Sequence, residues 1–132
     1  MNEVRSYNEG TSNYAQHKFQ VWDFWIKFKL NPFDGDLLKR TLRTKTTDPR
    51  ILDYKKIKHI CLERIRQFEN SINVFSLENI YVSKDLCEEM LKDYNLIEDD
   101  ENITYIILYP TTDRVNDYKE IIKLCDKRIK EL

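Results

Sequence analysis

Apolar residues recur at helical spacing in the first half of the chain. Between residues 19 and 30 they fall at i, i+3, i+4 and i+7, which is the pattern of an amphipathic helix. The residues of this stripe are Val21, Phe24, Trp25 and Phe28, widened by Trp22 and Ile26. We expect this helix to end at Asn31, because the residue before a proline is disfavoured in the helical region.

Two further helices are predicted before residue 70. One starts at Asp34, whose carboxylate can cap free backbone amides, and runs to about Thr44. The other has Asp48 as its N-cap and Pro49 in its first turn, and it extends to about Phe68. Its apolar stripe consists of Ile51, Tyr54, Ile57, Cys61, Ile65 and Phe68. We expect this longest element to be the spine of the fold.

The pattern changes after residue 70. Residues 72–82 and 103–109 are rich in β-branched and aromatic side chains, so each segment predicts a short strand. The other predicted elements are a short helix capped by Ser83 over residues 84–94, an acidic loop at 98–102 and a last helix from 111–113 to Leu132. Two short strands are stable only if they pair and rest on helices, so the strands and helices of this half must pack together.

These elements predict a mainly α fold in one domain of 132 residues. A flexible arm at residues 1–13 precedes a helical unit of three helices at residues 14–70. Residues 71–132 are expected to form a small α+β appendage, with two short strands and two helices, that shares the core of the helical unit. No repeat of 20 to 50 residues is visible.

The composition is that of a globular protein, with 41% hydrophobic and 34% charged residues. The longest apolar run, residues 105–109, is far shorter than a membrane-spanning helix, and the N-terminus has no apolar signal core. We therefore expect a cytoplasmic protein without a membrane partner. The cysteines are widely spaced and form no C-x-x-C pair, so Cys61, Cys87 and Cys125 are expected to be free, buried thiols.

Charge divides the chain into two halves. Residues 1–69 hold 14 Lys and Arg against 9 Asp and Glu, a net charge of +5. Residues 70–132 hold 8 against 14, a net charge of −6. This polarity is compatible with an anion site in the first half, with attraction between the halves, and with head-to-tail self-association.

Motifs for glycine-rich phosphate loops, zinc pairs and serine nucleophiles are absent from the sequence. A basic stretch remains, because residues 39–58 hold eight Lys and Arg against two Asp. Lys39 and Arg43 are one helical turn apart, with Asp36 on the same side, and this pair can grip a phosphate. The alternative is a solvated helix face with Asp36 and Asp53 as salt-bridge partners. The acidic second half argues against a nucleic-acid partner.

Three other features have both a functional and a structural interpretation. His17 is either a surface or capping residue or a group beside a ligand, and Trp22 either packs in the core or stacks on a base. The acidic residues 98–101 either bind a divalent ion or form a solvated loop, and they lack the spacing of a calcium loop, which favours the solvated loop.

A spaced set of residues over about residues 14–68 resembles the SaV-like family of small tailed-phage proteins. The set comprises Tyr14, His17, Lys18, Trp22, Asp23, Phe24, Leu30, Phe33, Gly35, Leu37, Leu38, Lys39, Arg43, Lys45, Asp53, Lys55 and Lys56. The family is described as a domain of unknown function, and the same domain occurs in a phage nucleotide kinase that lacks a phosphate loop. The resemblance implies a phage-type accessory protein in the cytosol of an infected bacterium.

The resemblance also implies a nucleotide or related phosphate ligand, with Mg²⁺ as its companion ion. The implied site residues are Lys39, Arg43 and Lys56 for phosphate, Asp36 and Asp53 for catalysis, and His17 and Trp22 for the base. An enzyme of this kind would be a nucleoside monophosphate kinase-like phosphotransferase, although the few carboxylates near the basic face favour binding without catalysis. The alternative is a non-enzymatic interaction protein that forms a homo-oligomer or binds a host or phage protein.

Overall fold

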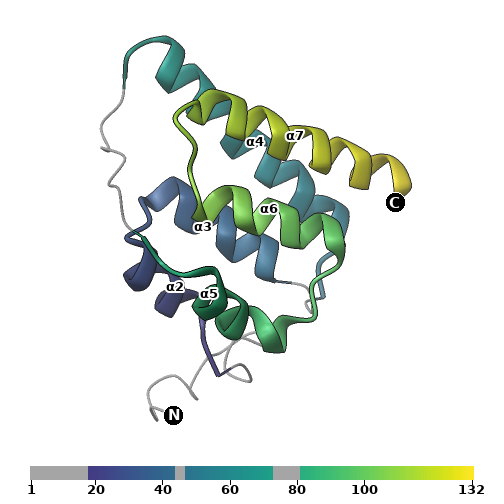
Figure 1. Ribbon diagram of the computed structural model, residues 1–132. Helices are drawn as coiled ribbons and strands as arrows, with labels where there is room; N and C mark the ends of the chain where they lie inside the picture. The colour runs from purple at the N-terminus through teal and green to yellow at the C-terminus, as the bar shows by residue number, and fades with distance from the viewer. Residues whose placement is uncertain (1–17, 44–46, 73–80) are drawn as a thin grey trace.

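The computed structural model describes residues 18–43, 47–72 and 81–132, which are mainly helical (Figure 1). The helices are α2 (Val21–Phe28), α3 (Pro32–Leu42), α4 (Arg50–Glu69), α5 (Lys84–Leu91), the 3₁₀-helix η2 (Lys92–Tyr94), α6 (Glu98–Leu108) and α7 (Arg114–Glu131). No strand occurs in these three segments. The prediction of a mainly α protein is confirmed, while the predicted arm at residues 1–13 lies outside the described residues.

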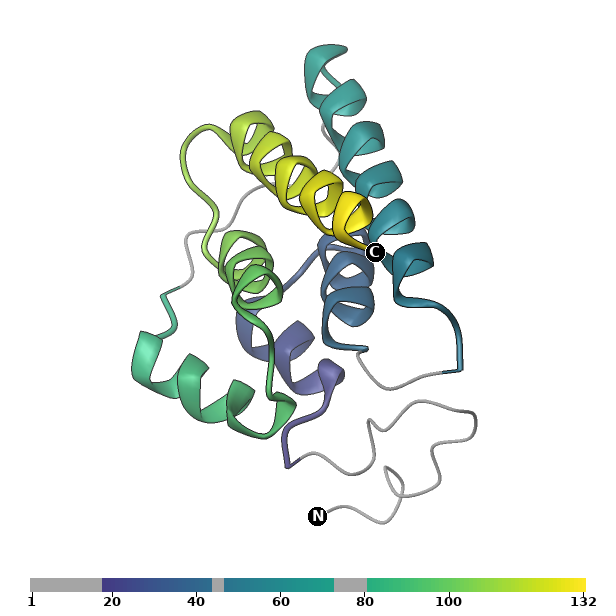
Figure 2. The same cartoon turned by 90° about the vertical axis from the view of Figure 1, so that its right-hand side faces the viewer.

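The helices are stacked in three layers of two (Figures 1 and 2). α4 and α7 pack against each other in the first layer, α3 and α6 form the middle layer, and α2 and α5 form the third. The middle layer contacts the first through α3 against α4 and through α6 against α7. Each layer therefore contains one helix from each half of the chain.

The second half of the chain repeats the helices of the first half. Residues 18–72, with α2, α3 and α4, are named the first unit, and residues 81–132, with α5, α6 and α7, the second unit. α2 and α5 have 8 residues each, α3 and α6 have 11 each, and α4 and α7 have 20 and 18. The turn before the second helix is repeated too, because Lys29 and Asn95 both adopt the left-handed conformation, with φ of 48° and 50°. The described segments thus form a tandem pair of units with three α-helices each.

The sequence carries this repeat at an uneven spacing. Each residue of α2 and α3 corresponds to the residue 66 positions later; for example, Asp34 corresponds to Asp100. Each residue of α4 corresponds to the residue 64 positions later; for example, Arg50 corresponds to Arg114. In the 16 positions that start at Arg50 and Arg114, 8 residues are identical. A search for periods of 20 to 50 residues misses this relation, because the period is longer and changes between α3 and α4.

The predicted strand at residues 103–109 is wrong, because these residues belong to α6 and its C-cap. The buried residues of α6 recur at helical spacing: Asp99, Asp100, Ile103, Thr104, Ile107 and Leu108. α6 lies in the middle layer and buries β-branched side chains against several helices, so its composition resembles that of a strand. The other predicted strand, at residues 72–82, falls largely on residues 73–80, outside the described segments.

The predicted acidic loop at residues 98–102 is also wrong. Residues 98–101 are Glu-Asp-Asp-Glu, and all four lie in the first turn of α6. The free backbone amides at a helix start favour negative charge at this position. An acidic run directly before an apolar run is therefore a helix start in this chain.

Two helix starts in the first unit differ from the predicted ones. The N-cap of α3 is Asn31, whose side chain accepts a hydrogen bond from the backbone nitrogen of Asp34 at 2.9 Å, so Asp34 is not the cap. α4 begins at Arg50 without a side-chain cap, so Asp48 does not have this role. In the second unit, Ser83 caps α5 as predicted, and α7 begins directly after Asp113.

One hydrophobic core contains side chains from both units. Phe24 and Leu37 of the first unit and Ile103 and Ile121 of the second are fully buried in it. The three cysteines are buried and free, as predicted. None of the helices in the described segments is long and apolar enough to cross a membrane.

Candidate functional site

The predicted basic site lies partly inside a cluster of ion pairs. Arg43 and Asp53 are in contact, because Arg43 Nη2 donates a hydrogen bond to Asp53 Oδ1 at 2.8 Å. The Asp53 side chain is only 1% exposed, and its second oxygen accepts from Arg50 Nη1 at 3.1 Å. Both carboxylate oxygens of Asp53 therefore have guanidinium partners.

The other predicted site residues lie on the surface of the helices. Asp36 on α3 is 42% exposed and forms an ion pair with Arg40 at 3.3 Å. The exposed side chains are those of Lys39 on α3, Lys56 on α4 and Trp22 on α2. His17 lies outside the described residues.

Arg50 is the centre of a polar cluster at the C-terminal end of α3. Its guanidinium donates to three backbone carbonyl oxygens at 2.7 to 3.1 Å, those of Arg40, Thr41 and Arg43. The same guanidinium donates to Asp100 Oδ2 in the second unit at 3.0 Å, and the Tyr54 hydroxyl donates to Asp100 Oδ1 at 2.7 Å. Arg50 thus closes the end of α3 and ties α4 to α6.

Arg114 of the second unit makes the equivalent contacts to the first unit. Its Nη2 donates to Asp34 Oδ2 in the first unit at 3.0 Å, and the Tyr118 hydroxyl donates to Asp34 Oδ1 at 2.7 Å. Arg114 also donates to the carbonyl oxygens of Ile106 and Ile107 at the C-terminal end of α6, at 2.8 and 3.1 Å. Each unit therefore supplies the carboxylate that the arginine and tyrosine of the other unit bind.

A second arginine in each unit extends this reciprocal pattern. Arg64 Nε lies 3.3 Å from the Tyr118 hydroxyl, and Arg128 Nε lies 3.4 Å from the Tyr54 hydroxyl. Both guanidinium groups also lie over the ring of that tyrosine, at 5.8 and 5.7 Å from its centroid. Arg64 and Arg128 occupy equivalent positions, so the whole cluster is present twice.

Burial and charge fix the protonation of these groups. Burial and the neighbouring Asp34 raise the pKa of Tyr118 to about 12. Burial alone would lower the pKa of Arg114, but the charge of Asp34 raises it above its ordinary value. The tyrosines therefore stay protonated and the arginines stay charged near neutral pH. Such fixed donors and acceptors suit helix packing rather than acid–base catalysis, which needs a group that titrates near the working pH.

The sequence motifs named above do not point to these two clusters. A signal does exist, because the pattern Arg-x-x-Asp-Tyr occurs at residues 50–54 and again at 114–118. Both copies start a long helix. Charged residues repeated at two helix starts indicate buried pairs, although the sequence does not say which carboxylate each arginine binds.

The exposed surfaces of the two units differ. Four large apolar side chains are exposed on the helices of the first unit: Trp22 (61%), Ile26 (72%), Leu52 (44%) and Leu62 (50%). The equivalent residues of the second unit are Glu88, Lys92, Asn116 and Asp126. Because the two units share a fold, the fold does not require apolar side chains at these positions. At these four positions, exposed apolar side chains are therefore specific to the first unit.

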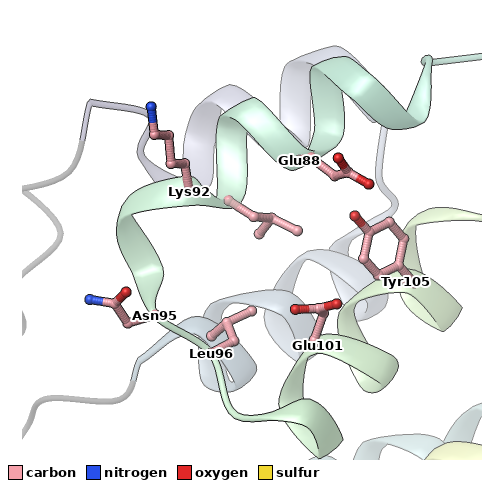
Figure 3. Close-up of a pocket in the computed structure, with 7 residues that line it drawn as sticks. Glu88, Lys92, Asn95, Leu96, Glu101 and Tyr105 are labelled. Carbon is pink, nitrogen blue, oxygen red and sulfur yellow. The ribbon is translucent and has the colours of Figure 1, made fainter.

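A groove of about 320 Å³ lies between α5 and α6 in the second unit (Figure 3). It is lined by Glu88, Leu91, Lys92, Asn95, Leu96, Glu101 and Tyr105. Glu88 comes from α5 and Glu101 from α6, and both side chains lie beside the Tyr105 ring, whereas Lys92 points away from it (Figure 3). Two carboxylates at its edge make the groove suited to a cationic or hydrogen-bond-donating group rather than to a phosphate.

Within the described segments, no group of three or more His, Cys, Asp or Glu side chains is placed to hold a metal ion. The chain matches no protein-family model, no curated protein and no solved structure. Its function is therefore inferred from the geometry of the two units.

Proposed function

We propose that the protein is a non-enzymatic assembly protein that self-associates through the exposed apolar face of α2, in its first unit. The observation that carries this proposal is the contrast between equivalent positions. Trp22 and Ile26 are exposed on α2, where α5 has Glu88 and Lys92. Large apolar side chains on an otherwise polar surface are typical of protein–protein contacts, and tryptophan is prominent among the residues that contribute most to binding.

Charge favours a second copy of the chain as the partner. Among the described residues, the first unit has 12 Lys and Arg against 7 Asp and Glu, a net charge of +5. The second unit has 8 against 13, a net charge of −5. Opposite charges on two parts of one chain attract between copies and steer their encounter.

The ion pairs of the first unit support a non-enzymatic role. Asp53, which the family resemblance implies as a catalytic carboxylate, is buried with both oxygens bound by Arg43 and Arg50. A general base must reach the proton that it abstracts, so a carboxylate held in this way is poorly suited to that task.

Sedimentation velocity of the full chain over a range of concentrations tests this proposal. We expect a dimer whose dissociation constant rises with salt concentration, because salt screens exposed charges beyond about 8 Å at 0.15 M. A single monomeric species at every concentration would contradict self-association.

A nucleotide or related phosphate ligand is a second candidate, favoured by one observation. Lys39 and Lys56 are exposed, and their equivalents in the second unit are Tyr105 and Glu120. The shared fold does not require lysine at these positions. Calorimetric titration with nucleoside mono- and triphosphates and Mg²⁺ tests this candidate. We expect saturable heat that Lys39→Ala removes and that Lys119→Ala, on the second unit, leaves unchanged, whereas no heat at millimolar ligand contradicts it.

A further inference from the structure

In the first unit, a tryptophan fills the place that corresponds to the groove. Leu91 corresponds to Trp25, and Glu101 corresponds to Gly35. The Trp25 indole lies so close to Gly35 that an added Cβ atom would overlap the ring. Trp25 Nε1 donates a hydrogen bond to the Gly35 carbonyl oxygen at 3.2 Å. The first unit therefore shows what this space accommodates: an aromatic ring that carries an N–H donor.

The second unit leaves the same space open, because Leu91 is smaller than tryptophan. The volume of about 320 Å³ is at the small end of the range of about 300–1,000 Å³ for binding clefts. Leu91 and Tyr105 give it apolar surface, and Glu88 and Glu101 give it hydrogen-bond acceptors with negative charge. The groove fits an aromatic side chain with an N–H donor and a cation nearby.

A side chain of that kind is exposed on the same protein. Trp22 is 61% exposed, Ile26 follows one helical turn later at 72%, and Lys29 lies at the end of the same helix. Residues four positions apart, such as Trp22 and Ile26, share one face of a helix. This α2 face, defined by Trp22 and Ile26, offers an indole and an aliphatic group, and the exposed cation Lys29 follows at the C-cap.

The α2 face and the groove belong to the same end of the molecule. α2 and α5 form the third layer in both views (Figures 1 and 2). The rings of Phe24 on α2 and Tyr94 on η2 lie 6.2 Å apart, edge to face, so the two units touch at this end. Two copies that meet through this end about a twofold axis can form both contacts at once, which closes the dimer.

We infer that the groove between α5 and α6 binds Trp22 of a second copy, so that the protein forms a closed dimer with two reciprocal contacts. This inference rests on the proposed self-association and names its site. The Trp22 indole packs on Leu91 and Tyr105, and its N–H donates to the Glu101 carboxylate. Glu88 lies at the edge of the groove and attracts the basic first unit of the other copy.

Two variants each remove one side of this contact. Trp22→Glu gives α2 the residue that α5 has at the equivalent position, so the fold tolerates it. Leu91→Trp with Glu101→Gly gives the second unit the tryptophan–glycine pair of the first and fills the groove from within. We expect each variant alone to raise the dissociation constant of the dimer by about 30-fold or more, the effect of losing a central tryptophan anchor.

Mixing the two variants in equal amounts restores one contact. The mixture contains one copy with an intact groove and one with an intact α2 face. We expect sedimentation velocity to show a 1:1 heterodimer that is weaker than the wild-type dimer and stronger than the dimer of either variant. Glu88→Lys with Glu101→Lys is a second groove variant, confined to exposed positions, for use if the tryptophan graft does not fold.

The control is Ile97→Asn. This variant replaces an exposed residue of the second unit by the residue type at the equivalent position of the first unit, and it should leave the dissociation constant of the dimer unchanged. A monomeric wild-type chain contradicts both the proposed function and this inference. A wild-type dimer that survives these substitutions, or a mixture that stays dissociated, overturns the inference and leaves self-association standing.

Discussion

The two units of the molecule share their buried polar contacts and differ in their exposed helix faces. In each unit an aspartate in the first turn of the middle-layer helix accepts hydrogen bonds from an arginine and a tyrosine of the other unit, at 3.0 and 2.7 Å in both directions. The exposed face of α2 has Trp22 and Ile26, whereas the corresponding face of α5 has Glu88 and Lys92. The comparison separates residues that the fold needs from residues that are available for binding.

The reciprocal clusters also explain why two units form one domain. Neither unit contains a complete cluster, because Asp34 binds Arg114 and Asp100 binds Arg50. A buried arginine that loses its carboxylate partner is strongly destabilising. Each unit therefore depends on the other for its stability.

The largest expected effect comes from a matched pair of substitutions, Asp34→Asn and Asp100→Asn. Arg114, the partner of Asp34, is 1% exposed, whereas Arg50, the partner of Asp100, is 19% exposed. Breaking a buried pair costs about 3–5 kcal/mol. We expect Asp34→Asn to lower the free energy of unfolding by about 3 kcal/mol, since Asp117 still pairs with Arg114. Asp100→Asn should cost about 1–2 kcal/mol, because Arg50 retains some hydration.

Urea denaturation measures both free energies. Equal losses for the two variants would show that the burial of the arginine does not decide the cost. A larger loss for Asp100→Asn would contradict the comparison.

The ionisation of Tyr118 makes the free energy of unfolding depend on pH in the alkaline range. Its pKa is about 12 in the folded protein, because of burial and the neighbouring Asp34, compared with 10.0 for an unperturbed tyrosine. The unfolded chain loses this proton first, so the contribution of Tyr118 is complete below pH 10 and is lost as the pH rises to 12. The loss is on the order of 2–3 kcal/mol at most. Tyr118→Phe should therefore lose less stability over this pH range in urea titrations, and an unchanged pH dependence would contradict this role.

Gly35→Ala tests the contact between Trp25 and Gly35, which fills in the first unit the space that is a groove in the second. At a solvent-exposed position inside a helix, a change from glycine to alanine stabilises by about 1 kcal/mol. Here the added Cβ overlaps the Trp25 indole, so we expect a net loss of about 1–2 kcal/mol and a shift in tryptophan fluorescence. The control is Asn102→Ala, at an exposed position of α6 outside the groove, with a change within about 0.5 kcal/mol. A more stable Gly35→Ala variant would contradict the packing of Trp25.

The smallest expected effect is that of Lys58→Ala. Lys58 and Asp126 join the two units at 2.8 Å, but their side chains are 38% and 52% exposed. Exposed ion pairs contribute at most about 1 kcal/mol and weaken with salt. A loss above about 2 kcal/mol in thermal or urea denaturation would show that surface pairs, and not the buried clusters, hold the units together.

The sequence predicts local elements better than long-range partners. The stripes around Phe24 and Ile57 and the cap at Ser83 are local signals, and they identify α2, α4 and α5. The strand predicted at 103–109 is wrong because β-branched residues there are buried by neighbouring helices, which local composition does not report. The partner of Arg50 is 50 positions away, and the groove depends on Leu91 in place of a tryptophan. Both become visible only once the repeat is recognised.

The central claim is that Trp22 and Ile26, the exposed apolar residues of α2, serve association and not the fold. The direct test is one full-length variant that carries the second-unit residue at both positions: Trp22→Glu and Ile26→Lys. Sedimentation velocity at a concentration where the wild-type chain is dimeric should show a compact monomer. A dimer would contradict the role in association, and a slowly sedimenting, expanded chain would show that these residues are needed for the fold.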